Sequence, residues 1–148
     1  MGITFMGINV GIISSRFNQL VVDELLQACL NKLKEQGFKA NQIFHQTVPG
    51  ALEIPLALDL LAITKRYEVL IAIGAVIRGE TYHFEVVSDQ SAAGLMQVQL
   101  NHHIPVINGI ITTNNEEQAY ARTKVKGEEV AMVAIEMATL SRMIKNGQ

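Results

Sequence analysis

The chain has 148 residues, of which 49% are hydrophobic and 18% charged, and its formal net charge is −2 at pH 7. This length suits one domain, residues 1–148, that can bury a sizeable core. The chain has no long basic run and no tryptophan, and aromatic residues make up only 5% of it, so neither charge nor base stacking supports nucleic-acid binding.

The mean hydropathy of +0.22 is high for a chain of this size. No apolar run approaches the roughly 18 residues that span a bilayer, so we expect no membrane segment and place the apolar surplus at subunit interfaces. The first ten residues, MGITFMGINV, lack the basic region and cleavage site of a signal peptide. We therefore expect a cytoplasmic protein.

Short apolar runs alternate with helical patterns along the chain. The runs predicted as strands are Met6–Ile13, Ile43–Val48, Val69–Ile77 and Ile104–Ile111. The predicted helices are Leu20–Gln36, Leu52–Lys65, Glu80–His102, a short helix opened by a capping box at Thr113–Glu116, and a last helix near Gly127–Ile144. The runs NVGII and VLIAIGAVI are continuously apolar rather than alternating, which favours strands covered on both faces. The pattern predicts a three-layer α/β/α sandwich around a four-stranded parallel sheet.

In an open parallel sheet, ligands bind beyond the carboxyl ends of the strands. Phe17, Asn18, Glu53 and His83 all follow such ends, so we expect them at one rim. A buried strand that leads into a helix start near His83 would place free N–H groups beside a side chain that titrates near neutrality. This arrangement suits chemistry on a phosphorylated small molecule.

Each of these residues also has an ordinary structural interpretation. Phe17 and Asn18 fit an aromatic lid and a helix N-cap, and Glu53 fits a first-turn acid that favours the positive end of its helix. Gly79 fits a tight turn, and His83 alone is as well explained by a structural hydrogen bond.

The remaining histidines and the cysteine suggest no site. His102 and His103 are neighbours at a predicted helix end, where interaction with the helix C-terminus is the default, and His45 lies in a strand without an evident partner. Cys29 sits at helical spacing among apolar residues and is expected in the core. No metal-ligand spacing occurs, so we predict no metal, and nucleotide cofactors lack their usual glycine motif in this sequence. The basic segment 122–127 fits a solvated loop, or an anion site in which Arg122 grips a phosphate.

Five segments together resemble the lumazine synthase family. They are SRFN (15–18), VPGALEIPLA (48–57), GAVIRGETYHFEVV (74–87), PVINGIITTNNEEQA (105–119) and IEMA (135–138). The resemblance spans nearly the whole chain in the family's order, and it implies a flavodoxin-like sandwich that assembles as homopentamers with active sites between neighbouring subunits. It also implies a transferase of riboflavin biosynthesis that needs no cofactor. That enzyme condenses 5-amino-6-(D-ribitylamino)uracil with 3,4-dihydroxy-2-butanone 4-phosphate to give 6,7-dimethyl-8-ribityllumazine, phosphate and water.

The resemblance also implies roles for individual residues. Phe17 would stack on the pyrimidine, with Asn18 beside it, and His83 would transfer protons. The segment Ala51, Leu52 and Glu53 would bind the ribityl chain, and the strand end Ala75, Val76 and Ile77 would bind the pyrimidine edge. Glu80 and Thr81 would hold the phosphate through main-chain N–H groups, together with Arg122 from the adjacent subunit.

Three departures from the family's pattern concern the site and the assembly. Asn108 stands where many members have an aromatic residue that helps to enclose the pyrimidine. Glu80 places a carboxylate near the expected phosphate, so it must point away or be offset by Arg122. The segment after Arg122 is shorter than in relatives, so either Lys124 or Lys126 would replace a lysine found there, and we expect a pentamer or a pair of pentamers rather than a sixty-subunit capsid.

Two other function classes remain open at this stage. One is a flavin- or lumazine-binding protein that has lost catalysis, which Asn108 favours and the combination of His83, Glu53 and Arg122 opposes. The other is a structural shell protein, for which mutation of His83 would be without effect. Some members of the family enclose riboflavin synthase, which makes that enzyme a candidate partner.

Overall fold

The computed structural model describes residues 7–147 and forms from them a parallel sheet of four strands in the order β2-β1-β3-β4. The strands are β1 (Val10–Ser15), β2 (Ile43–Val48), β3 (Val69–Ile77) and β4 (Val106–Thr113). The helical elements between them are α1 (Gln19–Glu35), η2 (Ala40–Gln42), η3 (Ala51–Glu53), α2 (Ile54–Ile63), α3 (His83–His102) and α4 (Glu116–Lys145), where η marks a single 3-10 turn.

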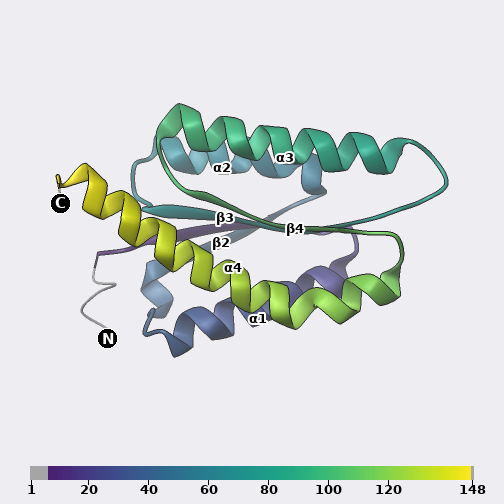
Figure 1. Cartoon of the computed structure of the whole chain (residues 1–148), viewed down its shortest axis with the longest axis horizontal. Helices are drawn as coiled ribbons and strands as arrows, with labels where there is room; N and C mark the ends of the chain where they lie inside the picture. The colour runs from purple at the N-terminus through teal and green to yellow at the C-terminus, as the bar shows by residue number, and fades with distance from the viewer. Residues whose placement is uncertain (1–6, 148) are drawn as a thin grey trace.

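Helices cover both faces of this sheet, with α2 and α3 on one face and α1 and α4 on the other (Figure 1). The predicted three-layer α/β/α sandwich is therefore confirmed. The helices formed by residues 7–147 include none that is long and apolar enough to cross a membrane.

The central strand β3 explains why the sheet is so apolar. Ile71 and Ile73 pack into the core under α1 and α4, whereas Leu70 and Ala72 pack into the core under α2 and α3. Only the last residue of the strand, Ile77, is not fully buried. Because helices cover both faces, a strand that alternated apolar and polar residues would bury polar side chains in one of the two cores. The predicted bounds of β3 are exact. The bounds predicted for β2 are exact as well.

The other two strands end later than their apolar runs. β1 extends through Ser14 and Ser15, which are buried and pair with β2, and β4 extends to Thr113, which pairs with the end of β3. Strand ends are set by pairing with neighbours rather than by apolar content. Both strands also begin later than expected, and Met6 lies outside the described residues.

The bounds of the helices correct two further predictions. The segment expected as the helix Leu52–Lys65 is the turn η3 followed by α2, which ends at Ile63 and has Pro55 in its first turn, where no main-chain N–H is needed. The helix expected from Glu80 begins at His83, and residues 80–82 form bends and a turn.

The largest correction concerns the C-terminal third of the chain. The expected short helix and separate last helix are one continuous helix, α4, and the basic segment 122–127 is a part of it rather than a loop. Its N-cap is Asn115, whose side chain accepts a hydrogen bond from Gln118 N, and not Thr113. Gly127 does not end a helix but permits close packing, because a Cβ there would lie 2.6 Å from Leu25 O of α1.

Candidate active site

A cavity of about 340 Å³ opens at the carboxyl ends of β1 and β3. Eleven residues line it, from four segments of the chain: Phe17, Asn18, Gly50, Ala51, Leu52, Glu53, Ala75, Val76, Ile77, His83 and Val87. The four residues expected at one rim, Phe17, Asn18, Glu53 and His83, are thus brought together by the strand order. Gly50 and Val87 were given no role from the sequence, although both lie within the motifs quoted above, in segments 48–57 and 74–87.

Phe17 is held at the mouth of the cavity by its main chain and by a glycine. Its N–H donates to Pro49 O over 3.0 Å, and its ring lies against Gly50, where an added Cβ would be 2.6 Å from Cδ2 of the ring. The side chain is nevertheless 66% exposed, so one face of the ring is free to contact a ligand. A large exposed ring positioned in this way suits stacking on a planar ligand.

The sequence suggested that the Asn18 side chain caps α1, but it does not. The residue occupies the N-cap position in the left-handed region, with φ of 62°, and its Nδ2 donates to Ala75 O over 3.0 Å. Beyond Ile73 the strand β3 has no partner on the side of β1, so this bond occupies the first free carbonyl. Main-chain groups of alternate residues point to the same side of a strand, so those of Ile77 also face the cavity.

Glu53 is fixed at the cavity wall by the turn that precedes α2. Its Oε1 accepts a hydrogen bond of 2.9 Å from Gly50 N, which closes the turn η3. No other hydrogen bond holds the carboxylate among the described residues, and the side chain is exposed. One carboxylate oxygen therefore remains available to accept hydrogen bonds from ligand hydroxyl groups.

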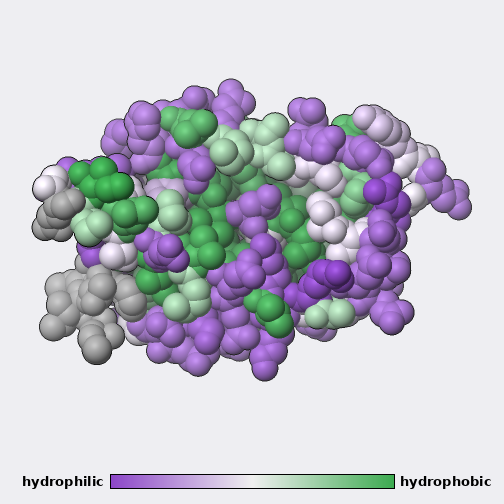
Figure 2. Space-filling model, viewed as in Figure 1, coloured by the Kyte–Doolittle hydropathy of each residue, from purple (hydrophilic) through white to green (hydrophobic). Residues whose placement is uncertain are grey.

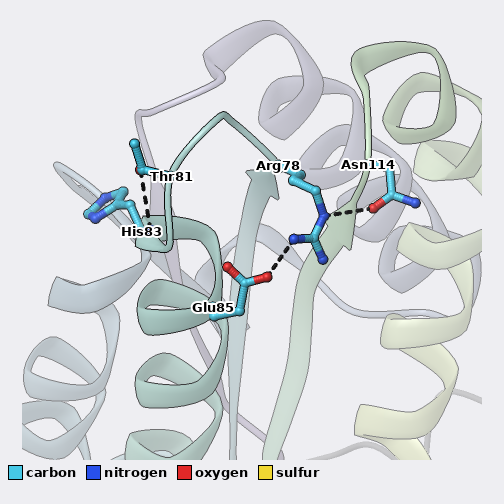
Figure 3. Close-up of polar contacts among 5 residues, drawn as sticks. All are labelled: Arg78, Thr81, His83, Glu85 and Asn114. Carbon is cyan, nitrogen blue, oxygen red and sulfur yellow. Dashed lines mark hydrogen bonds and ion pairs between the residues drawn. The ribbon is translucent and has the colours of Figure 1, made fainter.

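His83 lies at the other side of the cavity, as the first residue of α3 (Figure 3). Its side chain is exposed, and its N–H meets Thr81 Oγ1 at a long 3.4 Å. Within the described residues, the N–H groups of Glu80, Thr81 and Tyr82 have no acceptor in the chain. The loop before α3 therefore carries donors for an anion, at residues that the sequence had placed in the first turn of a helix.

The other predicted site residues lie apart from this cavity. Arg122 lines a second groove of about 690 Å³ between β4 and α4, together with Lys126 and the apolar side chains Ile110 and Val125. Arg122 Nη1 donates to Gln118 O at 2.9 Å, which leaves most of its donors free. Lys124 is exposed on α4 and is not part of the wall of this groove among the described residues.

Asn108 lies on β4, the edge strand, and its side chain is exposed but engaged. Its Oδ1 accepts a hydrogen bond of 3.0 Å from Ile110 N, and thereby satisfies a main-chain group on the unpaired edge of the sheet. It lines neither the cavity nor the second groove within residues 7–147. The amide nitrogen of Asn108 makes no hydrogen bond among the described residues and can donate to a group outside this chain.

Two histidines have partners that the sequence did not indicate. His45 Nε2 lies 2.7 Å from Ser14 Oγ on the neighbouring strand, and burial lowers the pKa of this histidine. His102 Nε2 lies 2.7 Å from Asp59 Oδ1 on α2, so a carboxylate and not the helix end is its partner. Cys29 is buried as expected, and burial raises the pKa of its thiol to about 12. The described residues contain no group of three or more side chains suited to hold a metal ion.

Comparison with known proteins gives a consistent result. A family model described as 6,7-dimethyl-8-ribityllumazine synthase matches residues 7–142. A protein of that name from Nitrosospira multiformis is 54% identical over 137 residues, which cover 93% of this chain and 86% of the relative. Proteins of the same name from Methylibium petroleiphilum and Cupriavidus metallidurans are 50% and 48% identical, and each alignment covers 90% of this chain and 83% or 79% of the relative.

Proposed function

Because the chain belongs to the 6,7-dimethyl-8-ribityllumazine synthase family, we propose that the cavity beside Phe17 and His83 is where it joins its two substrates. Membership makes the chain a transferase-type enzyme of riboflavin biosynthesis, acting at the penultimate step. The substrates are 5-amino-6-(D-ribitylamino)uracil and 3,4-dihydroxy-2-butanone 4-phosphate. The products are the lumazine, phosphate and water.

The uracil occupies the part of the cavity between the strand ends. Its ring stacks on Phe17, its polar edge meets main-chain groups at the end of β3, Ala75–Ile77, and its ribityl hydroxyl groups donate to Glu53. The exposed face of the Phe17 ring, the unpaired strand end and the half-occupied carboxylate support this placement. Asn18 acts beside them by holding Ala75 O.

The butanone phosphate occupies the part of the cavity beside His83. The free N–H groups of Glu80 and Thr81 bind its phosphate, and the exposed Glu80 carboxylate either points away or is offset by Arg122. The reaction adds an amine to a ketone, loses water, eliminates phosphate and closes a ring, and each step moves a proton. A histidine at the rim suits this work, and general acid–base help is typically worth about 10²–10⁴-fold.

The observation that carries the proposal is that predicted site residues line two separate cavities of one chain. Phe17, Glu53 and His83 line one cavity, whereas Arg122 and Lys126 line another. We infer that the second cavity completes the first cavity of a neighbouring subunit, with Arg122 gripping the phosphate through parallel hydrogen bonds. Lys126 rather than Lys124 then stands beside Arg122, because it shares the groove.

The surface supports assembly from several copies. Figure 2 shows apolar side chains gathered between α3 and α4, and the groove there is lined by Leu100, Ile104, Pro105, Leu140 and Ile144. A closed ring of subunits would bury this face and form every site in the same way. A pentamer, or a pair of pentamers, is the assembly that we propose. Association with riboflavin synthase and a cytoplasmic location stay predictions from the sequence.

Two variants test the divided site. His83→Ala and Arg122→Ala should each make lumazine slowly, as followed by its absorbance and by phosphate release, and Arg122→Ala should raise KM for the butanone phosphate far more than for the uracil. When the two variants are expressed together, roughly one interface in four regains an intact site in a randomly mixed ring. The mixture should therefore exceed the activity of either variant. A mixture no more active than the mean of its components would reject the shared site.

A further inference from the structure

Arg78 is the first residue after β3, and its guanidinium joins three segments of the chain (Figure 3). Its Nε donates a 3.0 Å hydrogen bond to Asn114 Oδ1, in the turn between β4 and α4. Its Nη1 donates to Glu85 Oε2 in the first turn of α3, and its Cζ lies 4.2 Å from the centre of the Phe84 ring. The N–H of Arg78 also donates to Thr113 O over 2.8 Å.

These contacts close the loop that carries the proposed phosphate donors. Residues 79–82 are all exposed, and within residues 7–147 their only side-chain hydrogen bond is the long one that Thr81 Oγ1 accepts from His83 N. No atom of the described residues packs against the loop at Gly79, because a Cβ added there would have no neighbour within 4 Å. The position of the loop therefore depends on its two ends, and Arg78 ties these ends together by way of Glu85.

The surroundings of the guanidinium argue against its binding phosphate directly. Glu85 neutralises its charge, and the hydrogen bond from Arg78 lowers the pKa of that carboxyl, so the pair stays charged at neutral pH. Phe84 covers one face of the guanidinium and Asn114 occupies Nε. Arg122 differs in all three respects: among the described residues no carboxylate pairs with it, no aromatic ring covers its guanidinium, and its hydrogen bond uses Nη1 rather than Nε.

We propose that Arg78 is a positioning residue: by joining the end of β3 to the first turn of α3 and the start of α4, it fixes the loop 79–82 and His83 in the arrangement that the condensation requires. This inference rests on the proposed function, because it presumes that the loop binds the phosphate and that His83 moves the proton. The arginine acts through its neighbours and touches neither substrate.

Kinetics of the full-length assembly test this role. Arg78→Ala should lower kcat by about 10- to 100-fold, the cost of misplacing reacting groups by an ångström, and raise KM for the butanone phosphate more than for the uracil. Arg78→Lys keeps a charge for Glu85 but cannot also reach Asn114, so it should lie between the wild type and Arg78→Ala. Arg66→Ala, which removes an exposed arginine from the opposite end of β3, is the matched control and should match the wild type.

Hydrogen exchange separates this inference from the proposed function, because it needs no activity. The first hydrogen-bonded amides of α3, residues 86–89, should exchange faster in Arg78→Ala than in the wild type, with the amides of the sheet unchanged. A raised KM for the butanone phosphate with unaltered kcat would mean a direct phosphate ligand and would overturn the positioning role, as would unchanged kinetics. If the wild-type chain makes no lumazine, the proposed function is wrong. The positioning role of Arg78 in the condensation is then wrong too, whatever the exchange rates. If Arg78→Ala does not fold, Glu85→Gln, which leaves the arginine in place, should show the same pattern more weakly.

Discussion

Asn18 and Ala75, which are 57 residues apart, are joined by a 3.0 Å hydrogen bond from the Asn18 amide to the Ala75 carbonyl. The bond crosses from the start of α1 to the end of β3 and so holds two walls of the cavity together. It also requires Asn18 to adopt a left-handed backbone conformation, which asparagine tolerates better than most residues. The side chain and the backbone of one residue thus set the shape of the site.

Asn18→Ala should lower the free energy of unfolding by about 1–2 kcal/mol, because it removes a half-buried hydrogen bond and strains a positive φ. Asn18→Gly is the control, since it relieves the strain and lacks only the bond, and it should lose less stability. Both variants should raise KM for the uracil, because Ala75 O is released into its site. Urea unfolding and steady-state kinetics measure these effects, and an Asn18→Gly variant less stable than Asn18→Ala would contradict the account.

Gly50→Ala should displace the Phe17 ring, because the new Cβ would lie 2.6 Å and 2.8 Å from two of its carbons. The ring is exposed and can rotate outward, so stability should change little. Loss of a stacking surface should raise KM for the uracil by about tenfold, which corresponds to 1.4 kcal/mol. KM for the butanone phosphate is the internal control. Equal effects on the two substrates would show that the change reaches beyond the ring.

His83→Ala should reduce kcat by about 10²-fold without abolishing turnover, because alignment of two substrates contributes to the rate independently of proton transfer. The side chain is exposed and makes no side-chain hydrogen bond among the described residues, so the fold should be unaffected. His103→Asn, at the other end of α3, is the control and should keep the wild-type rate. Full turnover in His83→Ala with both substrates bound normally would exclude His83 as the proton shuttle.

The sequence predicted the parts of the fold that follow from local patterns. A continuous apolar run needs cover on both faces, and β3 has the expected bounds for that reason. The rim could also be predicted, because parallel strands bring their carboxyl ends to one edge, and Phe17, Glu53 and His83 do meet there.

Features that depend on distant segments could not be predicted in this way. The bond from Arg78 to Asn114 joins residues 36 apart, and no local pattern encodes it. The sequence placed Gly127 near the start of a separate last helix. Its actual role, close packing inside α4, depends on how closely α1 approaches α4. The start of α3 at His83 likewise lies three residues after the start that the sequence predicted, Glu80.

Stability should fall on acidification in a manner that depends in part on His45. Burial lowers its pKa in the folded chain, although Asp23 opposes this, so the unfolded chain binds a proton at a higher pH than the folded chain does. The stability that neutral His45 contributes to the folded chain is fully present above the pKa of the unfolded chain, near 6.5. It is lost as the pH falls through the lower pKa of the folded chain. His45→Gln should therefore lose less stability than the wild type between pH 7.5 and about pH 5. Thermal unfolding across this range measures the difference, and His103→Asn is the control that should follow the wild type. If the stability of all three chains falls in parallel with pH, His45 does not contribute to the acid sensitivity.

Gly127→Ala tests whether the basic segment is a helix packed on α1. In an isolated helix this change is favourable by about 1 kcal/mol, but here the new Cβ would lie 2.6 Å from both Leu25 O and Ala28 Cβ. Overpacking of this kind costs about 1–3 kcal/mol, so we expect net destabilisation in urea unfolding. Glu136→Ala, at an exposed position further along the same helix, is the control and should be neutral or slightly stabilising. A more stable Gly127→Ala chain would mean that α1 and α4 do not approach each other as described, and that the segment 122–127 has the loop character that its composition suggests.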